Sequence, residues 1–292
     1  MNGTPRPRIR PALPPSLRRP AARAAAWAAR PAPARLIRTA VTATAVSATA
    51  TSSLVMMTPT AAAPALAAQL AAPQARSFTG TPAAGALFTS KNGHLTHFCT
   101  ASVVHSRRGN LLITAAHCMQ GRSLRPAGVV TFAPGYHDGH FPHGRWIVRA
   151  SYTDSRWKAS RDPNDDVAFL IAGRTGRHIE KYTGAETLAT GTSLPREVKV
   201  IGYPDTSGLP VSCWAKARAF TRPHLRQEVF DCAGYTDGTS GGPFLYHVSK
   251  TTGTGRVIGV IGGYQQGGNT PAISYSARFG ATIAALYKKA TS

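Results

Sequence analysis

The sequence predicts an all-β protein built from closed antiparallel barrels or a sandwich. Eleven short runs rich in Val, Ile, Phe, Tyr and Thr follow one another along the second two thirds of the chain, and Gly, Pro, Asn and Asp punctuate them. Helical periodicity is nearly absent. Many short strands at this spacing are typical of β-barrels and sandwiches.

The elements are expected in a fixed order. A single helical turn is expected near 115–119 and a longer helix over 281–290. In the longer segment Ile283 and Tyr287 lie one helical turn apart, and Lys288-Lys289 favours a helix C-terminus. The expected strands are 94–105, 109–114, 128–132, 145–152, 166–171, 197–202, 212–220, 228–232, 243–248, 255–264 and 272–278.

The first 67 residues differ in composition from the rest of the chain. They hold nine Arg and no acidic residue, and all twelve acidic residues of the protein lie after residue 137. A basic lead, the weakly apolar stretch 39–57 and the small residues Ala65-Leu66-Ala67 form the three-part pattern of a secretory signal peptide. The alternative is a disordered basic tail on an intracellular protein. Separately, a start at Met56 or Met57 would remove the apolar stretch and with it the case for export.

The length, composition and charge of the chain are those of a folded domain that follows the basic segment. The chain has 292 residues, 42% of them hydrophobic, which is enough for a folded core. Its net charge is +22, and removing the nine N-terminal charges leaves +13. No run of about 18 apolar residues exists, so no transmembrane helix is expected. We expect residues 1–67 to be the signal peptide or basic disordered segment, 68–82 to be a linker or short pro-segment, and 83–292 to be the folded domain.

Four cysteines follow the basic segment: Cys99, Cys118, Cys213 and Cys232. An even number in an exported chain suggests two disulfides, for which three pairings exist. In a cytosolic protein they would be free thiols. A zinc site is not expected, because no cysteine pair has the usual ligand spacing. The three histidines of loop 134–143 are interpreted as part of a solvated loop.

Two segments suit a general base and its orienting acid. In Leu111–Cys118 (LLITAAHC) an apolar run leads into His117, whose place on a short turn beside a cysteine fits a base with a fixed position. Asp166 comes immediately before the apolar run 167–171, where its carboxylate can be partly buried and orient an imidazole. Asp165 is the alternative for this role.

A third segment suits a nucleophile. In Gly238–Pro243 (GTSGGP) the glycines allow a tight turn that exposes the hydroxyl of Ser240. We expect the backbone N–H groups of Gly238 and Ser240 to form an oxyanion hole.

The motifs T-A-A-H-C, D-x-A-x-L and G-x-S-G-G-P, in this order, resemble those of chymotrypsin-like (trypsin-like) serine proteases, over roughly residues 83–292. The short interval between Asp166 and Ser240 is similar to that of compact secreted bacterial members. The resemblance implies two antiparallel six-stranded β-barrels that meet near 175–195, with the triad His117, Asp166 and Ser240 at their seam and a short C-terminal helix. It also implies export and the disulfides Cys99–Cys118 and Cys213–Cys232.

The specificity pocket departs from the family pattern. Where trypsins carry an Asp at the pocket floor, this chain has Gly234, and the expected wall is Ile261, Gly262 and Gly263. Asp237 is expected at the pocket rim. Because none of the floor and wall residues is ionisable, we expect a preference for neutral, mostly apolar side chains before the scissile bond. The residue before the nucleophile is Thr239 rather than the Asp that pairs with a freed N-terminus in animal members.

These observations predict a secreted serine endopeptidase that works through an acyl-enzyme. No cofactor or metal is implied, the partners are protein or peptide substrates, and a monomer that binds neither nucleic acid nor membrane is expected. The Lys and Arg residues of the mature part of the chain are interpreted as part of a solvated surface, because they are scattered along the sequence. The alternatives are a non-catalytic homologue that binds anionic partners through its positive charge, and an esterase side activity.

Overall fold

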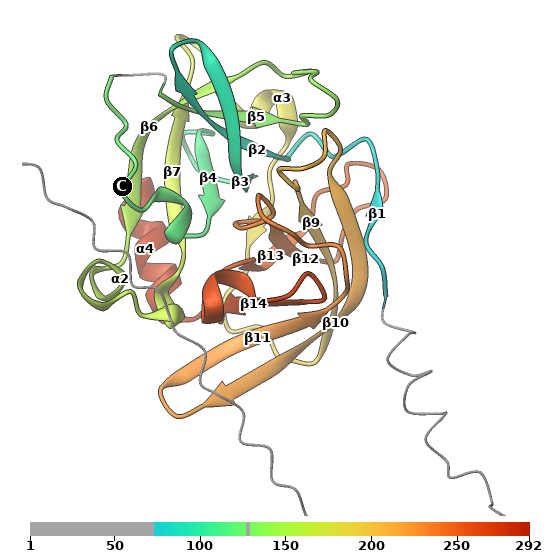
Figure 1. The fold of residues 1–292 in the computed structure, drawn as a ribbon. Coiled ribbons are helices and arrows are strands. Elements are labelled where there is room, and N and C mark those ends of the chain that lie inside the picture. The colour runs from blue at the N-terminus through green and yellow to red at the C-terminus, as the bar shows by residue number, and fades with distance from the viewer. Residues whose placement is uncertain (1–72, 127–128) are drawn as a thin grey trace, which may run out of the picture. The chain divides into compact units, whose positions relative to one another are not determined.

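The computed structural model of the chain describes residues 73–126 and 129–292 (Figure 1). The expected export segment 1–67 lies outside the described residues. Residues 73–82, expected as a linker or pro-segment, contribute strand β1 (Arg76–Ser77), which pairs with a strand of the second sheet. No helix in these described ranges is long and apolar enough to cross a membrane.

The first half of the fold is a closed six-stranded barrel. Its strands follow the order β2-β3-β4-β7-β6-β5 and pair antiparallel all the way round. Gly85 is required where the barrel closes, since a Cβ there would lie 2.2 Å from the carbonyl oxygen of Ala133. The strands are β2 (Ala84–Lys91), β3 (His94–Val104), β4 (Leu111–Thr114), β5 (Val130–Pro134), β6 (Trp146–Thr153) and β7 (Ala168–Gly173).

The second half is an eight-stranded sheet. Its main path runs β14-β11-β10-β9-β12-β13-β8, and β1 is attached to β10. The long β10–β11 hairpin extends away from the rest of the sheet (Figure 1). The strands are β8 (Thr187–Leu188), β9 (Arg196–Gly202), β10 (Val211–Arg222), β11 (Leu225–Asp231), β12 (Pro243–Tyr246), β13 (Arg256–Val260) and β14 (Ile273–Ala277).

The all-β class is therefore confirmed, and the second half is a sheet less regular than the six-stranded barrel that the resemblance implied. β13 and β14 do not pair as a ladder. Instead, the Val260 N–H donates to the hydroxyl of Ser276 at 2.9 Å, and the Gly262 N–H donates to the carbonyl of Tyr275 at 2.9 Å. These bonds close the seam between the two strands without a continuous ladder.

The helices are short apart from the last. Helix α4 (Ala281–Thr291) buries Ile283, Leu286 and Ala290 and packs against β6 and β7, as the sequence predicted. The turn η1 (His117–Met119) was also expected. The sequence did not indicate the other helical segments, which are α2 (Ser155–Ser160), η2 (Pro163–Asp165), α3 (Glu180–Thr183) and η3 (Tyr264–Gly267).

Both disulfides implied by the family resemblance are present. Cys99–Cys118 joins β3 to η1, and Cys213–Cys232 joins β10 to the residue after β11. Each closes a sequence separation of 19 residues. In the chain-entropy model a loop of this size stabilises the folded state by about 3 kcal/mol. The first disulfide also anchors the turn on which His117 lies.

Candidate active site

His117 and Asp166 are joined through two hydrogen bonds. The backbone N–H of His117 donates to Asp166 Oδ1 at 2.8 Å, and Nδ1 of its ring lies 2.8 Å from Asp166 Oδ2. The N–H of Gly263, from the second sheet, also donates to Oδ2 at 2.7 Å. The Asp166 side chain is fully buried, whereas that of His117 is 11% exposed. When Nδ1 carries the hydrogen and donates to the carboxylate, Nε2 keeps a free lone pair.

Asp165 contacts a different partner. Its carboxylate forms an ion pair with Arg156, with Nε 2.8 Å from Oδ2. Burial raises the pKa of Asp165, and the hydrogen bond and charge of Arg156 counteract the effect. Arg156 also donates to the hydroxyl of Thr282 on α4. Arg156 therefore links Asp165 on η2 to the C-terminal helix, while Asp166 faces the imidazole.

The Ser240 turn is held by hydrogen bonds on both sides. The carbonyl of Ser240 accepts from the Thr100 N–H at 2.7 Å, and the carbonyl of Gly238 accepts from the Thr100 hydroxyl at 2.9 Å. The N–H of Gly241 donates to the carbonyl of Ile261 at 2.7 Å. Among the described residues, the N–H groups of Gly238 and Ser240 have no acceptor.

Gly238 has no tolerated replacement at its backbone geometry. Its φ is +87°, and a Cβ would lie 2.5 Å from the Asp205 nitrogen and 2.7 Å from the Tyr203 carbonyl oxygen. A residue with a side chain would be strained and would also collide with backbone. Glycine at this position therefore allows the Ser240 turn to lie against the 203–205 loop.

Sequence reasoning missed the side chain that joins the two halves of the fold behind Asp166. Gln227, on β11, is fully buried. Its Oε1 accepts the N–H of Tyr264 at 3.0 Å, and its Nε2 donates to the Pro163 carbonyl and to Asn164 Oδ1, both at 3.2 Å. One amide thus holds the η2 turn of the first barrel and the Gly263–Tyr264 backbone of the second sheet. A single Gln in a strand carries no signal by which sequence alone could identify this role.

A pocket of about 900 Å³ brings His117 and Ser240 to one surface. Of the expected specificity residues, Asp237 and Ile261 line it. Its other neutral walls come from the Ser240 turn, the 265–271 segment and β14, and comprise Tyr235, Thr236, Gln265, Gln266, Asn269, Thr270, Pro271 and Ser274.

Three glycines that were expected in the specificity pocket are not among the residues that line this pocket. A Cβ on Gly234 would meet Ala75 of the N-terminal segment at 3.1 Å. A Cβ on Gly262 would meet Asp166 Oδ2 at 3.1 Å, and one on Gly263 would overlap Oε1 of Gln227. Gly234 therefore faces the chain near β1, while Gly262 and Gly263 allow Asp166 and Gln227 to approach the β13–η3 backbone.

The charges around the pocket lie at its rim. Asp237, Asp205 and Arg122 are exposed, whereas the buried lining residues are all neutral. His97 is a second histidine in the lining. Burial lowers the pKa of His97, and its hydrogen bond to the Cys99 carbonyl together with the charge of Asp205 opposes that shift. The neutral form of this ring is thus favoured at neutral pH.

Comparison with known proteins identifies the family. The family model described as trypsin matches residues 73–281. The chain belongs to the trypsin family. The match begins ten residues before the domain boundary expected from the sequence.

Three similar proteins extend this comparison. An extracellular metalloprotease of Bacillus subtilis (strain 168) is 28% identical over 178 residues, which are 59% of this chain and 53% of that protein, so the chain spans about half the length of this curated relative. Protease Anisep from Arthrobacter nicotinovorans is 22% identical with a TM-score of 0.63, over 74% of this chain and 99% of that one. The thermostable serine protease AL20 from an extremophilic microorganism is 24% identical with a TM-score of 0.60, over 72% and 97% of the two chains. Both structures share the fold of this trypsin-family chain.

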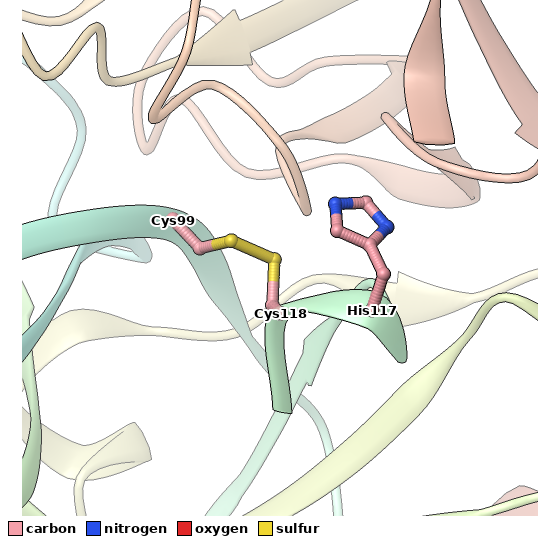
Figure 2. A group of neighbouring side chains, drawn as sticks. All are labelled: Cys99, His117 and Cys118. Carbon is pink, nitrogen blue, oxygen red and sulfur yellow. A yellow bond between two sulfur atoms is a disulfide. The ribbon is translucent and has the colours of Figure 1, made fainter. Parts of the chain in front are cut away.

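The metal implied by the name of the Bacillus protein does not fit the described residues of this chain. In the described part of the chain, the side chains grouped closely enough to ligate an ion are Cys99, His117 and Cys118. Figure 2 shows the His117 ring beside the disulfide that joins the two cysteines. Disulfide sulfur is not the thiolate that binds zinc, so one imidazole remains where a zinc site needs three or four protein ligands.

Proposed function

We propose that Ser240 is the nucleophile, His117 the general base and acid, and Asp166 the residue that orients His117. Ser240 Oγ attacks the scissile carbonyl carbon while its proton passes to Nε2 of His117. The imidazolium then gives this proton to the departing amine, and the C–N bond breaks. Water repeats the sequence on the acyl-enzyme, which releases the acid and restores the Ser240 hydroxyl.

The free N–H groups of Gly238 and Ser240 are proposed to stabilise the oxyanion of both tetrahedral intermediates. The observation that carries the whole proposal is the set of donors around Asp166. Its carboxylate accepts hydrogen bonds from the backbone N–H of His117, from Nδ1 of the His117 ring and from the N–H of Gly263. These bonds orient the imidazole, which lines the same pocket as Ser240.

A phosphonylating active-site probe tests the assignment directly. The full chain should be labelled at Ser240, as read by peptide mapping, and Ser240→Ala should lose labelling and lower kcat/KM for a peptide by several orders of magnitude. The control is Ser249→Ala, which removes an exposed serine outside the pocket. Labelling elsewhere, or full activity of Ser240→Ala, would refute the triad. A chain that takes up no probe and cleaves no peptide would instead favour the non-catalytic alternative.

We further propose that the pocket prefers a neutral, mostly apolar residue before the scissile bond. Its buried lining residues, among them Tyr235, Ile261 and Ser274, carry no charge, and burying an unpaired substrate charge against them is costly. A peptide library that varies this one residue tests the idea. Arg or Lys preferred by about tenfold, or 1.4 kcal/mol, would contradict it. Loss of that preference in Asp237→Asn would then identify the rim carboxylate as the cause.

Export is the third part of the proposal. We propose that residues 1–67 direct secretion and that the protein works outside the cell. Two disulfides and the word extracellular in the name of the Bacillus relative support this location. In a bacterial host, the full chain should appear in the culture medium, and a chain lacking 1–67 should stay inside the cell. Equal retention of the two chains would contradict export.

A further inference from the structure

The first barrel carries a basic surface to which the catalytic proposal gives no role. Six exposed arginines lie on the β3–β4 turn, on or just before β6, and on the turn after β7. None of them lines the catalytic pocket. We call them the arginine patch: Arg107, Arg108, Arg145, Arg149, Arg174 and Arg177.

Two aromatic rings hold part of the arginine patch together. The guanidinium of Arg174 lies 5.6 Å from the centre of the Trp146 ring, and that of Arg177 lies 5.6 Å from the centre of the Tyr182 ring. The two rings are 5.9 Å apart. Stacking on aromatic faces restricts these side chains before any partner binds, so less conformational entropy is lost on binding.

Two glycines and one backbone contact bring the remaining arginines alongside. A Cβ on Gly144 would lie 2.5 Å from a guanidinium nitrogen of Arg174, and a Cβ on Gly173 would lie 2.8 Å from Nε of Arg149. The side chain of Arg174 thus passes over Gly144 in the turn before β6, and that of Arg149 passes over Gly173 at the end of β7. On the other side, the ring of His178 lies 2.6 Å from the carbonyl oxygen of Arg108.

The charge of the arginine patch is not compensated within the described residues. Arg156 and Arg218, elsewhere in the fold, form ion pairs with carboxylates, but no arginine of the patch does. Glu180 is the carboxylate carried by the adjacent α3, and it contacts His105 and the Ser106 N–H. An exposed set of cations with this arrangement produces a positive potential that attracts anions.

We propose that the arginine patch binds a polysaccharide that carries sulfate or phosphate esters. The planar guanidinium donates two parallel hydrogen bonds to such oxyanions, which favours Arg over Lys. A peptide strand has no free edge to pair with, because the barrel is closed. Nucleic-acid bases would find few rings to stack on beside the arginine patch, because Trp146 is buried and the half-exposed ring of Tyr182 already packs against Arg177.

Binding of fluorescent dextran sulfate to the full chain, followed by anisotropy over a salt series, tests the proposal. In the patch variant, Arg149, Arg174 and Arg177 are replaced by Gln. In the matched control, the exposed Arg76, Arg226 and Arg256 are replaced by Gln, so that both proteins lose three charges. The patch variant should bind at least about tenfold more weakly at 0.1 M salt, and its log–log salt slope should be shallower by about 2 to 3.

The control variant should change affinity less than about threefold, and both variants should keep the wild-type melting temperature and peptidase activity. Equal weakening of the two variants would show that net charge alone binds the polymer and would overturn the proposal. Failure of the wild-type protein to bind dextran sulfate at 0.1 M salt would also overturn it. Poly-glutamate and single-stranded DNA are the competing ligands. Tighter binding of either one would refute the choice of a polysaccharide.

Discussion

The buried carboxyl of Glu228 should make the free energy of unfolding decrease as the pH rises. The side chain lies on β11 and is 2% exposed, and its Oε2 has no hydrogen-bond partner among the described residues. Burial raises the pKa of Glu228 from 4.5 to about 8, and the charge of Arg278 counteracts part of the shift. The folded protein therefore holds a proton on this carboxyl that the unfolded chain has lost at neutral pH.

The size of the effect follows from the shift. When folding raises the pKa of a carboxyl, the free energy of unfolding is highest below the pKa of the unfolded state. It then decreases as the pH rises from that value to the pKa of the folded state. The loss is about 1.4 kcal/mol per pH unit. Glu228→Gln keeps the shape and removes the titration, so it should be more stable than the parent by about 3 kcal/mol at pH 7. For a domain of this size that corresponds to roughly 6–12 °C in melting temperature.

Calorimetry at pH 5, 6, 7 and 8 measures this difference, with Ser240→Ala in every protein to prevent self-digestion. Glu186 has a pKa raised by burial to about 8 as well, but it is present in both proteins and cancels in the comparison. Glu197→Gln, at an exposed position on β9, is the matched control and should show no trend. A difference between Glu228→Gln and its parent that stays flat from pH 5 to pH 8 would refute the reasoning, because it would mean that Glu228 is ionised when folded.

Two further predictions concern the site itself. Gln227→Met removes the acceptor of the Tyr264 N–H and should lower kcat by about tenfold to a hundredfold with little change in KM, and Gln227→Glu, which keeps that acceptor, should recover part of the loss. A fall in melting temperature without any change in kcat would show a purely structural role. Gly238→Ala should lower kcat/KM by about 10²- to 10³-fold, because its Cβ would displace the turn from Asp205. The control Gly191→Ala has a similar φ of +69° with open space around it, so equal loss of activity in both would contradict the collision argument.

Sequence reasoning predicted the elements with a clear pattern and missed those without one. Helix α4 has apolar residues one turn apart and was predicted, whereas α2 is six residues long and too short to show a period. Strand β2 was not among the expected strands. Its first residues, Ala84, Gly85 and Ala86, have low strand propensity, but small side chains are needed where the barrel closes on β5.

The candidate site shows the same division. Asp166 was expected to orient His117, and the two lie within hydrogen-bond distance. The pocket was harder to predict because its walls depend on loop geometry that the motifs do not encode. Gly234 is turned toward Ala75, in a segment expected to lie outside the domain. The arginine patch was likewise read as scattered cations, since only the barrel brings the β3–β4 turn beside the turn after β7.

The bond from Gly263 to Asp166 has a consequence for the cell that makes this protein. A nascent chain emerges from the ribosome with its N-terminus first, so His117 and Asp166 emerge well before Ser240 and Gly263. Under the proposed mechanism, a half-made or prematurely terminated chain has a base but neither a nucleophile nor the backbone that completes the acid's surroundings. Incomplete chains should therefore not cleave proteins of the cell that makes them. Activity begins only when the last third of the chain has been synthesised and has folded onto the first barrel.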